Sequence, residues 1–196
     1  MLENEIIKIF IIAVGLLLAN KDIRALYRTV ASRFLPHDIK VREQIQDVLD
    51  ELLIKLGAAR INIWQFNNGT RSLSGYSYKF SSIIFESFDR HNLISLKRDF
   101  QNLPVEDYSV LLVRLQDCDK YITNTIDSDI PFVRAMYTTV GVKTGIEFKL
   151  NNKDIYKGFI SVSFYDKITV TESMIREIET SIALVNQYIK NIKTLS

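Results

Sequence analysis

Two long amphipathic helical patterns enclose several strand-like segments, and this order limits the folds open to the chain. Residues 39–56 carry apolar side chains three and four positions apart, which is the spacing of one helix face. Residues 171–192 repeat that spacing, and Thr171 with Glu172 suits a helix start. Each helix therefore needs a hydrophobic surface to pack on.

Strand patterns supply that surface. Residues 59–66 alternate apolar and polar side chains, as a strand with one buried face does. The Asn-Gly pair within residues 67–70 predicts a turn after this strand. Further strands are predicted at residues 76–88, 95–103, 143–150 and 157–165, the last two joined by a polar hairpin turn.

Two shorter helices are predicted between the two groups of strands. Pro104 opens one that extends to about Gln116, and Pro131 opens another that extends to about Thr139. Residues 117–129 between them read as a polar stretch. The order helix, strands, helices, strands, helix predicts an α+β domain, in which an antiparallel sheet carries the first and last helices on one face.

The second half of this pattern resembles a GAF domain. Gly141 precedes the strand predicted at residues 143–150, which contains Gly145; a polar hairpin follows, and Gly158 lies near the start of the next strand, before the long final helix. The resemblance covers roughly residues 40–192 and implies a GAF-like antiparallel sheet with helices packed on it. It also implies a fold that binds ligands or partners more often than it catalyses.

A narrower resemblance lies in residues 64–69, Trp-Gln-Phe-Asn-Asn-Gly, taken with residues 81–86. They are similar to a GAF-like group of phage and bacterial proteins, in which an aromatic-His-Asn-Gly turn precedes a Ser-rich strand that ends in Glu. This chain has Asn67 where that group often has His. The imidazole's role in that group therefore does not carry over to this chain.

The same region supplies the predicted ligand contacts. The turn and Arg71 are suited to holding an anion, and the nearby aromatic side chains are suited to stacking on a planar ligand. The structural alternative is a plain hairpin turn beside aromatics that pack the sheet. The predicted ligand-binding residues are Trp64, Phe66, Asn67, Asn68, Arg71, Tyr78, Phe80 and Glu86.

Residues 6–19 form an apolar run broken only by Lys8. As a helix, fourteen residues cover about 21 Å, which is short of the roughly 30 Å hydrocarbon core of a bilayer. The run is therefore either a membrane anchor, with Lys8 snorkelling at one end, or a helix that packs in a homo-oligomer. The predicted membrane or oligomer contacts are Ile6, Ile9, Phe10, Ile11, Ile12, Val14, Leu16, Leu17 and Leu18.

Charges around this run predict an orientation. Glu3 and Glu5 precede it, while Lys21, Arg24 and Arg28 follow it. If the segment spans a membrane, the positive-inside rule places the domain in the cytoplasm. We divide the chain into an N-terminal helix with a joint, residues 1–37, and a GAF-like domain, residues 38–196.

Composition and motifs argue against several functions. The net charge of +2 gives no strong attraction to nucleic acid. One cysteine and two histidines make a closed zinc site improbable. Bilin-carrying GAF domains usually have His after the attachment Cys, whereas Asp119 follows Cys118 here. No catalytic triad or phosphate-binding loop is recognisable, so we predict no enzymatic activity and identify no cofactor.

Two functions follow from the sequence. The first is a non-catalytic binding module, tethered to a membrane with its domain in the cytoplasm, that senses a small molecule or a partner. The alternative is a structural protein, for instance of a phage particle (a virion component), that uses the fold as a scaffold and its N-terminal helix for oligomer contacts. A sensor requires an open pocket of roughly 300 Å³ or more. A scaffold predicts a pocket filled by Trp64, Phe66, Tyr78, Phe80 and Phe85.

Overall fold

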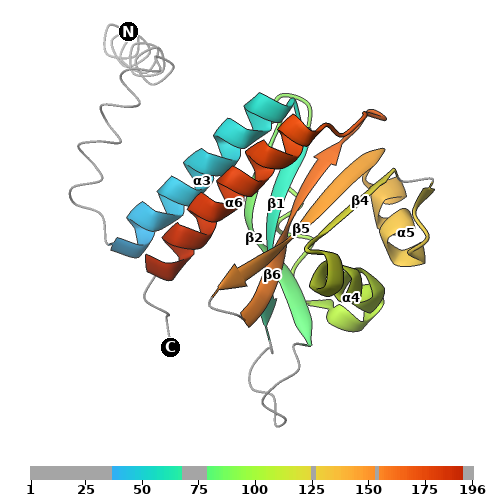
Figure 1. Cartoon of the computed structure of the whole chain (residues 1–196), viewed down its shortest axis with the longest axis horizontal. Coiled ribbons are helices and arrows are strands. Elements are labelled where there is room, and N and C mark those ends of the chain that lie inside the picture. The colour runs from blue at the N-terminus through green and yellow to red at the C-terminus, as the bar shows by residue number, and fades with distance from the viewer. Residues whose placement is uncertain (1–36, 68–78, 125–126, 153–154, 192–196) are drawn as a thin grey trace, which may run out of the picture. The chain divides into compact units, whose positions relative to one another are not determined.

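The computed structural model describes residues 37–67, 79–124, 127–152 and 155–191 (Figure 1). Within them, six strands form one antiparallel sheet in the order β3-β2-β1-β6-β5-β4. The strands are β1 (Arg60–Asn67), β2 (Phe80–Phe88), β3 (Leu103–Pro104), β4 (Lys120–Asn124), β5 (Thr144–Asn152) and β6 (Ile155–Phe164). The predicted α+β class with an antiparallel sheet is confirmed.

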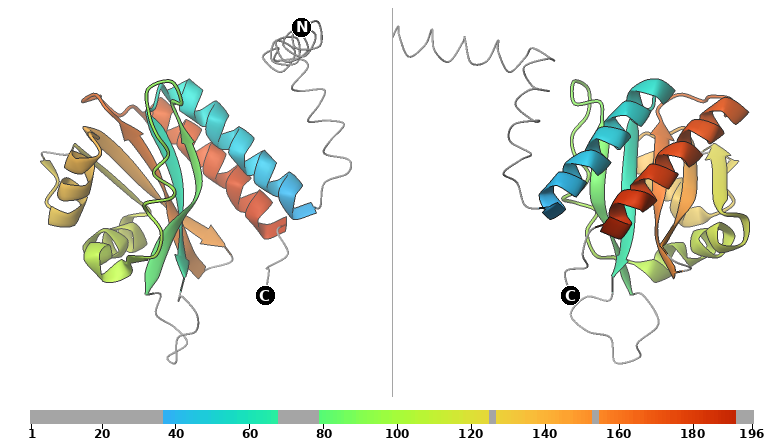
Figure 2. Two further views of the ribbon diagram at one scale, coloured as in Figure 1. Left: turned by 180° about the vertical axis from the view of Figure 1, so that it is seen from behind. Right: turned by 60° about the vertical axis from the view of Figure 1, so that its left-hand side comes forward.

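Helices α3 (His37–Leu56) and α6 (Glu172–Asn191) lie side by side on one face of this sheet (Figures 1 and 2). Their apolar stripes cover a mostly hydrophobic sheet surface, as the spacing of both segments predicts. The buried core on this face includes Val41, Ile45, Leu49, Leu52, Ile61, Ile63, Phe85, Ile146, Phe148, Ile160, Val162, Ile175, Ile178 and Val185.

The opposite face is covered by a 3₁₀ helix, η1 (Val105–Tyr108), and by helices α4 (Ser109–Cys118) and α5 (Pro131–Thr139) (Figure 2). A second core forms here from Trp64, Phe66, Ile83, Tyr108, Leu111, Leu115, Ile130, Val133, Tyr137, Val142 and Phe159. The sheet is thus buried on both faces, and the polar positions of its alternating strands also lie in the interior.

Two predictions about individual elements are wrong. Residues 95–103 do not form a strand, and only Leu103 and Pro104 pair with β2. The preceding backbone donates hydrogen bonds to the carboxylate of Glu86 instead of pairing with a strand. The polar stretch 117–129 contains β4, which pairs with β5 at the edge of the sheet. An edge strand has one unpaired side, so polar residues suit it and its apolar alternation is weak.

Two glycines allow close packing on the central strands. A Cβ atom added to Gly145 would lie 2.3 to 2.6 Å from the phenol of Tyr137, so α5 rests directly on β5 at this point. A Cβ added to Gly158 would lie 1.9 Å from the carbonyl oxygen of Trp64 on the neighbouring strand. Any side chain at either position would push its neighbour away.

The predicted N-terminal helix falls outside the described residues, and so do its contacts from Ile6 to Leu18. Among the helices that the structure does describe, none is both long and apolar enough to cross a membrane. The division of the chain at residue 37 stays a prediction.

Candidate ligand-binding site

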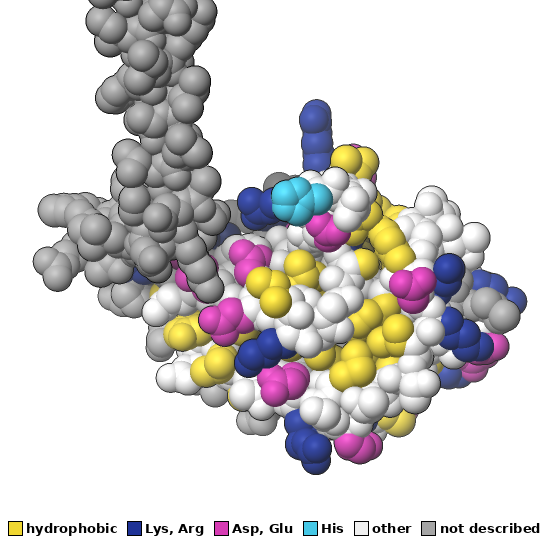
Figure 3. Space-filling model, turned by 90° about the horizontal axis from the view of Figure 1, so that it is seen from above, with side chains coloured by type: hydrophobic (Ala, Val, Ile, Leu, Met, Phe, Trp, Pro, Cys, Tyr) yellow, Lys and Arg dark blue, Asp and Glu magenta, His cyan; other side chains and the backbone are white. Residues whose placement is uncertain are grey.

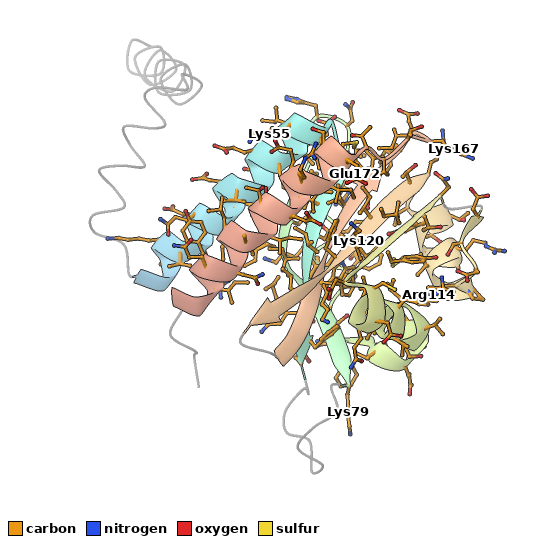
Figure 4. All side chains as sticks on the ribbon, in the orientation of Figure 1. Lys55, Lys79, Arg114, Lys120, Lys167 and Glu172 are labelled. Atoms are coloured by element: carbon orange, nitrogen blue, oxygen red, sulfur yellow. The ribbon has the colours of Figure 1, made fainter. Side chains whose placement is uncertain are left out.

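A cleft opens between the central strands and the helices α4 and α5. About 260 Å³ at the cleft is free of atoms, but this includes open solvent, and the enclosed part holds about one water molecule. Hydrophobic side chains line the cleft: Trp64, Leu103, Tyr108, Leu111, Phe132, Val133, Met136 and Phe159. Side chains lie between the sheet and α4 (Figure 4), and they leave little enclosed space. The cleft is therefore narrow, and its walls offer apolar and aromatic surface.

Aromatic side chains form the floor of this cleft. The rings of Trp64 and Phe159 stack with centroids 5.4 Å apart and planes at 10°, and Phe100 meets Trp64 edge-on at 5.9 Å. Tyr108 is buried, and its hydroxyl contacts the hydroxyl of Ser81. Burial raises the pKa of Tyr108 to about 12, so the phenol stays neutral at physiological pH.

A row of polar side chains crosses the sheet on the same face, beside this floor. Directly paired residues of neighbouring strands point to the same face, and the register joins Glu86 of β2, Asn62 of β1, Ser161 of β6, Glu147 of β5 and Tyr121 of β4. Along β1, Asn62 is two residues from Trp64, a distance of about 7 Å. Polar row and aromatic floor are thus adjacent.

At one end of the row, Glu86 has a full set of partners. Its carboxylate forms an ion pair with Arg60, and both side chains are at most 4% exposed. It also accepts hydrogen bonds from Ser95 Oγ, from the backbone N–H of Leu96 at 2.9 Å and from that of Lys97 at 3.3 Å. Glu86 therefore anchors the loop between β2 and β3 to the sheet.

Glu147, one strand in from the other end of the row, is incompletely satisfied. Glu147 is 1% exposed, and it accepts one long hydrogen bond, from Ser161 Oγ to Oε1 at 3.4 Å. Burial raises the pKa of Glu147 to about 8, so the acid is mostly protonated at neutral pH. Two buried oxygens on the row lack hydrogen-bond partners, Oε2 of Glu147 and Oδ1 of Asn62.

Some of the predicted site residues gather at this face. Trp64 and Phe66 are buried, and both rings pack against Phe159. Asn67 ends β1, pairs with Phe80 of β2 and donates a hydrogen bond to Ser82 Oγ at 3.3 Å, so by strand alternation Asn67 and the half-buried Phe80 point to the opposite face. Asn68, Arg71 and Tyr78 lie outside the described residues. Ligand binding by any of these residues stays a prediction.

Two expectations about aromatics and acids need adjustment. Phe85, expected to help fill the pocket, lies on the opposite face in the core under α3 and α6, because an irregularity in the β1–β2 register separates it from Ile83. Glu86, predicted as a ligand contact, is already engaged by Arg60 and the loop after β2. Glu86 therefore has no free carboxylate oxygen to bind a ligand.

Asn62, Ser161 and Glu147 were not identified from the sequence. Each lies between two large apolar residues in its strand, for instance Glu147 between Ile146 and Phe148, and this alternation suggests a solvent-exposed polar face. The two predicted helices that follow Pro104 and Pro131 could have indicated that this polar face is buried. Their apolar residues require a sheet face to cover, and that face is the one bearing the polar alternation.

Other candidate chemistry in the described part of the chain is sparse. No group of three or more His, Cys, Asp or Glu side chains there is arranged to hold a metal ion. Cys118 is exposed at the end of α4. Figure 3 views the surface at the end of the domain where α3 stops and α6 starts. On this surface, hydrophobic patches are interspersed with acidic and basic side chains.

Comparison with known proteins identifies the fold. Neither a protein-family model nor a curated protein sequence matches the chain. Among solved structures, the phycoerythrobilin-bound GAF domain of a cyanobacterial phytochrome matches with a TM-score of 0.64 at 17% identity, over 86% of this chain and 94% of that one. The GAF domain/HD domain protein of Geobacter sulfurreducens matches with a TM-score of 0.60 at 10% identity, over 83% and 97%.

A third match is the GAF domain of a two-component sensor histidine kinase from Bacillus halodurans. Its TM-score is 0.55 at 15% identity, and the match covers 75% of this chain and 94% of that one. At these identities the likeness establishes the fold. The described domain is GAF-like, as the sequence resemblance indicates.

Proposed function

We propose that the domain is a non-catalytic binding module, and that it takes a small molecule on the α4/α5 face of the sheet. The observation that carries this proposal is the apolar cleft over Trp64 and Phe159, with polar groups beside it on the same face. Such a combination is typical of small-molecule sites, where apolar walls supply contact area and a few polar groups orient the ligand. The phytochrome domain with the same fold is bilin-bound, and another match is part of a sensor kinase.

Native mass spectrometry of the full-length chain from its natural source tests this proposal. We expect one small molecule bound per chain. Met136→Trp places an indole in the cleft and should remove the bound mass, whereas Ala135→Trp, at an exposed position of the same helix, should retain it. A wild-type chain without a bound molecule, or equal occupancy in both variants, would contradict the proposal.

We also propose that residues 6–19 tether the domain to a membrane, with the domain in the cytoplasm. The support is the apolar run itself and the acidic-to-basic change in charge across it. The full-length chain should sediment with membranes, and a chain without residues 1–35 should remain soluble. A full-length chain that is a soluble monomer without detergent would exclude this arrangement.

One observation favours the alternative of a structural or assembly protein. The enclosed part of the cleft holds about one water molecule, far below the roughly 300 Å³ at which most ligand pockets begin, and rings of the domain itself occupy its floor. In this case the fold is a scaffold, and the N-terminal segment makes the contacts of a homo-oligomer. The same mass spectrum would then show a ligand-free oligomer that dissociates when residues 1–35 are removed.

A further inference from the structure

Two buried oxygens on one face of the sheet lack partners, and both lie on the same polar row. Oδ1 of Asn62 and Oε2 of Glu147 project from β1 and β5, and Ser161 of β6 lies between them. Strands two apart in a sheet are about 10 Å from one another, so a single small group can lie between these side chains. A buried polar atom without a hydrogen bond costs about 1–3 kcal/mol. Two such atoms on one polar row indicate a third group that reaches both of them.

The cations of β1 and β5, Arg60 and Lys149, are engaged elsewhere. Arg60, two residues from Asn62 on β1, pairs with Glu86 and donates to the carbonyl oxygen of Ile94 at 2.8 Å. Lys149, two residues from Glu147 on β5, bonds to Asp119 at 3.1 Å and to the carbonyl oxygen of Gln116 at 3.2 Å. A buried carboxyl without a neighbouring cation is held protonated by desolvation, and a cation that reached it would allow it to ionise.

We propose that Glu147 and Asn62 form the polar end of the ligand site and receive a protonated nitrogen of the ligand. The ligand is then a small amine or amidine with an apolar body. The proposal rests on the proposed binding function and specifies the chemistry of that site. An ammonium or amidinium group donates to both oxygens and supplies the missing positive charge, while Glu147 releases its proton to solvent.

The adjoining cleft accounts for the rest of such a ligand. Asn62 and Ser161 are each two residues from the stacked rings of Trp64 and Phe159, which is about 7 Å along the strands. A ligand the size of benzylamine spans that distance, with its ring against the aromatic floor and its nitrogen at the row. A neutral N–H donor would satisfy Asn62 but would leave Glu147 protonated, whereas a cation can form the stronger charge-assisted hydrogen bond with the ionised carboxylate, so the cation is favoured.

A matched pair of probes tests this inference on the full-length chain. Benzylamine, which is protonated at pH 7, and benzyl alcohol have the same ring and nearly the same size but differ in charge. Isothermal titration calorimetry should show that the wild-type chain binds benzylamine at least tenfold more tightly than benzyl alcohol. Glu147→Gln should remove this preference, and the exposed Glu106→Gln should leave it unchanged.

Several results would overturn the inference. They are equal affinity of the wild-type chain for the two probes, binding of neither, and benzylamine binding that survives Glu147→Gln. The probe comparison needs only the wild-type chain, so it decides even if the variant does not fold. A natural ligand that is displaced by Met136→Trp but lacks a basic nitrogen would also overturn the inference, while the proposed function would stand.

Discussion

The two buried glutamates of the polar row occupy similar positions and have opposite surroundings. Glu86 and Glu147 lie on the same face of the sheet, and Asn62 and Ser161 separate them. Glu86 has Arg60 and three donors from the loop after β2, whereas Glu147 has a single long hydrogen bond. The fold thus supplies Glu86 with a full set of hydrogen-bond and charge partners and leaves Glu147 without one.

This difference separates a structural acid from a candidate functional one. Burial alone does not distinguish them, since both side chains are less than 10% exposed. The number of partners does, because a saturated carboxylate stabilises its loop and an unsaturated one retains capacity to bind. The predictions below therefore compare the Glu86 end of the row with the Glu147 end.

The largest effect is expected at the Glu86 end. Arg60→Met leaves the carboxyl of Glu86 buried without its cation, which should reduce the free energy of unfolding by about 3–5 kcal/mol in urea denaturation. The double variant Arg60→Met/Glu86→Gln should recover part of that loss, because no charge is left buried and the amide oxygen still accepts from one of the loop N–H groups. A loss below about 1 kcal/mol in the single variant would show that the ion pair is not what anchors the loop.

The protonation of buried Glu147 should make the stability of the domain depend on pH. The pKa of Glu147 is raised from 4.5 to about 8 in the folded domain, so between these values the unfolded chain has released a proton that the folded chain retains. Stability should therefore fall as pH rises, by on the order of 2–4 kcal/mol between pH 5 and pH 8. Glu147→Gln should lose less than about 1 kcal/mol over that range, and an equal pH dependence of the two proteins would refute the assignment.

A substitution at Gly145 tests how tightly α5 packs on β5 next to Glu147. A methyl group there meets the phenol of Tyr137, so Gly145→Ala should destabilise the domain by about 1–3 kcal/mol. Adding Tyr137→Leu should cost less in the Gly145→Ala variant than in the wild type, as a double-mutant cycle by thermal denaturation would measure. Strict additivity would mean that α5 shifts freely and does not hold the Glu147 end closed.

A surface ion pair gives the baseline for these comparisons. Lys55 and Glu177 join α3 to α6 at 3.4 Å, but their side chains are 59% and 45% exposed. Lys55→Gln should change the free energy of unfolding by less than about 0.5 kcal/mol, since solvent and salt screen the pair. A loss as large as that of Arg60→Met would mean that burial is not what makes the Glu86 pair valuable.

Periodicity allowed much of the fold to be predicted. The helices at both ends and the strands around Ile61, Ile146 and Ile160 have clear apolar spacing, because one of their faces packs on the large core under α3 and α6. Strand β4 lacks that signal, since it lies at an edge. The neighbouring strand β5 was therefore predicted from the sequence, whereas β4 was not.

The candidate site was harder to predict for a physical reason. Trp64 and Phe66 were identified because they belong to the motif at residues 64–69 that resembles a GAF-like group, and because aromatic side chains can stack on a planar ligand. Glu147 and Asn62 have the residue types expected on an exposed face, and only the helices that cover it place them in the interior. Their importance depends on contacts between segments far apart in the sequence, which local patterns do not report.

The strand order also constrains how the chain folds. At the centre of the sheet, β1 pairs with β6, so Ile61 finds its partner Val162 about a hundred residues later in the sequence. Contacts between such distant residues slow folding, and during synthesis at about 5–20 residues per second β1 emerges several seconds before β6. Until then, one edge of the β1–β2 hairpin and the apolar stripe of α3 lack their final partners. The nascent domain is therefore most exposed to aggregation and to chaperones before its last quarter has been made.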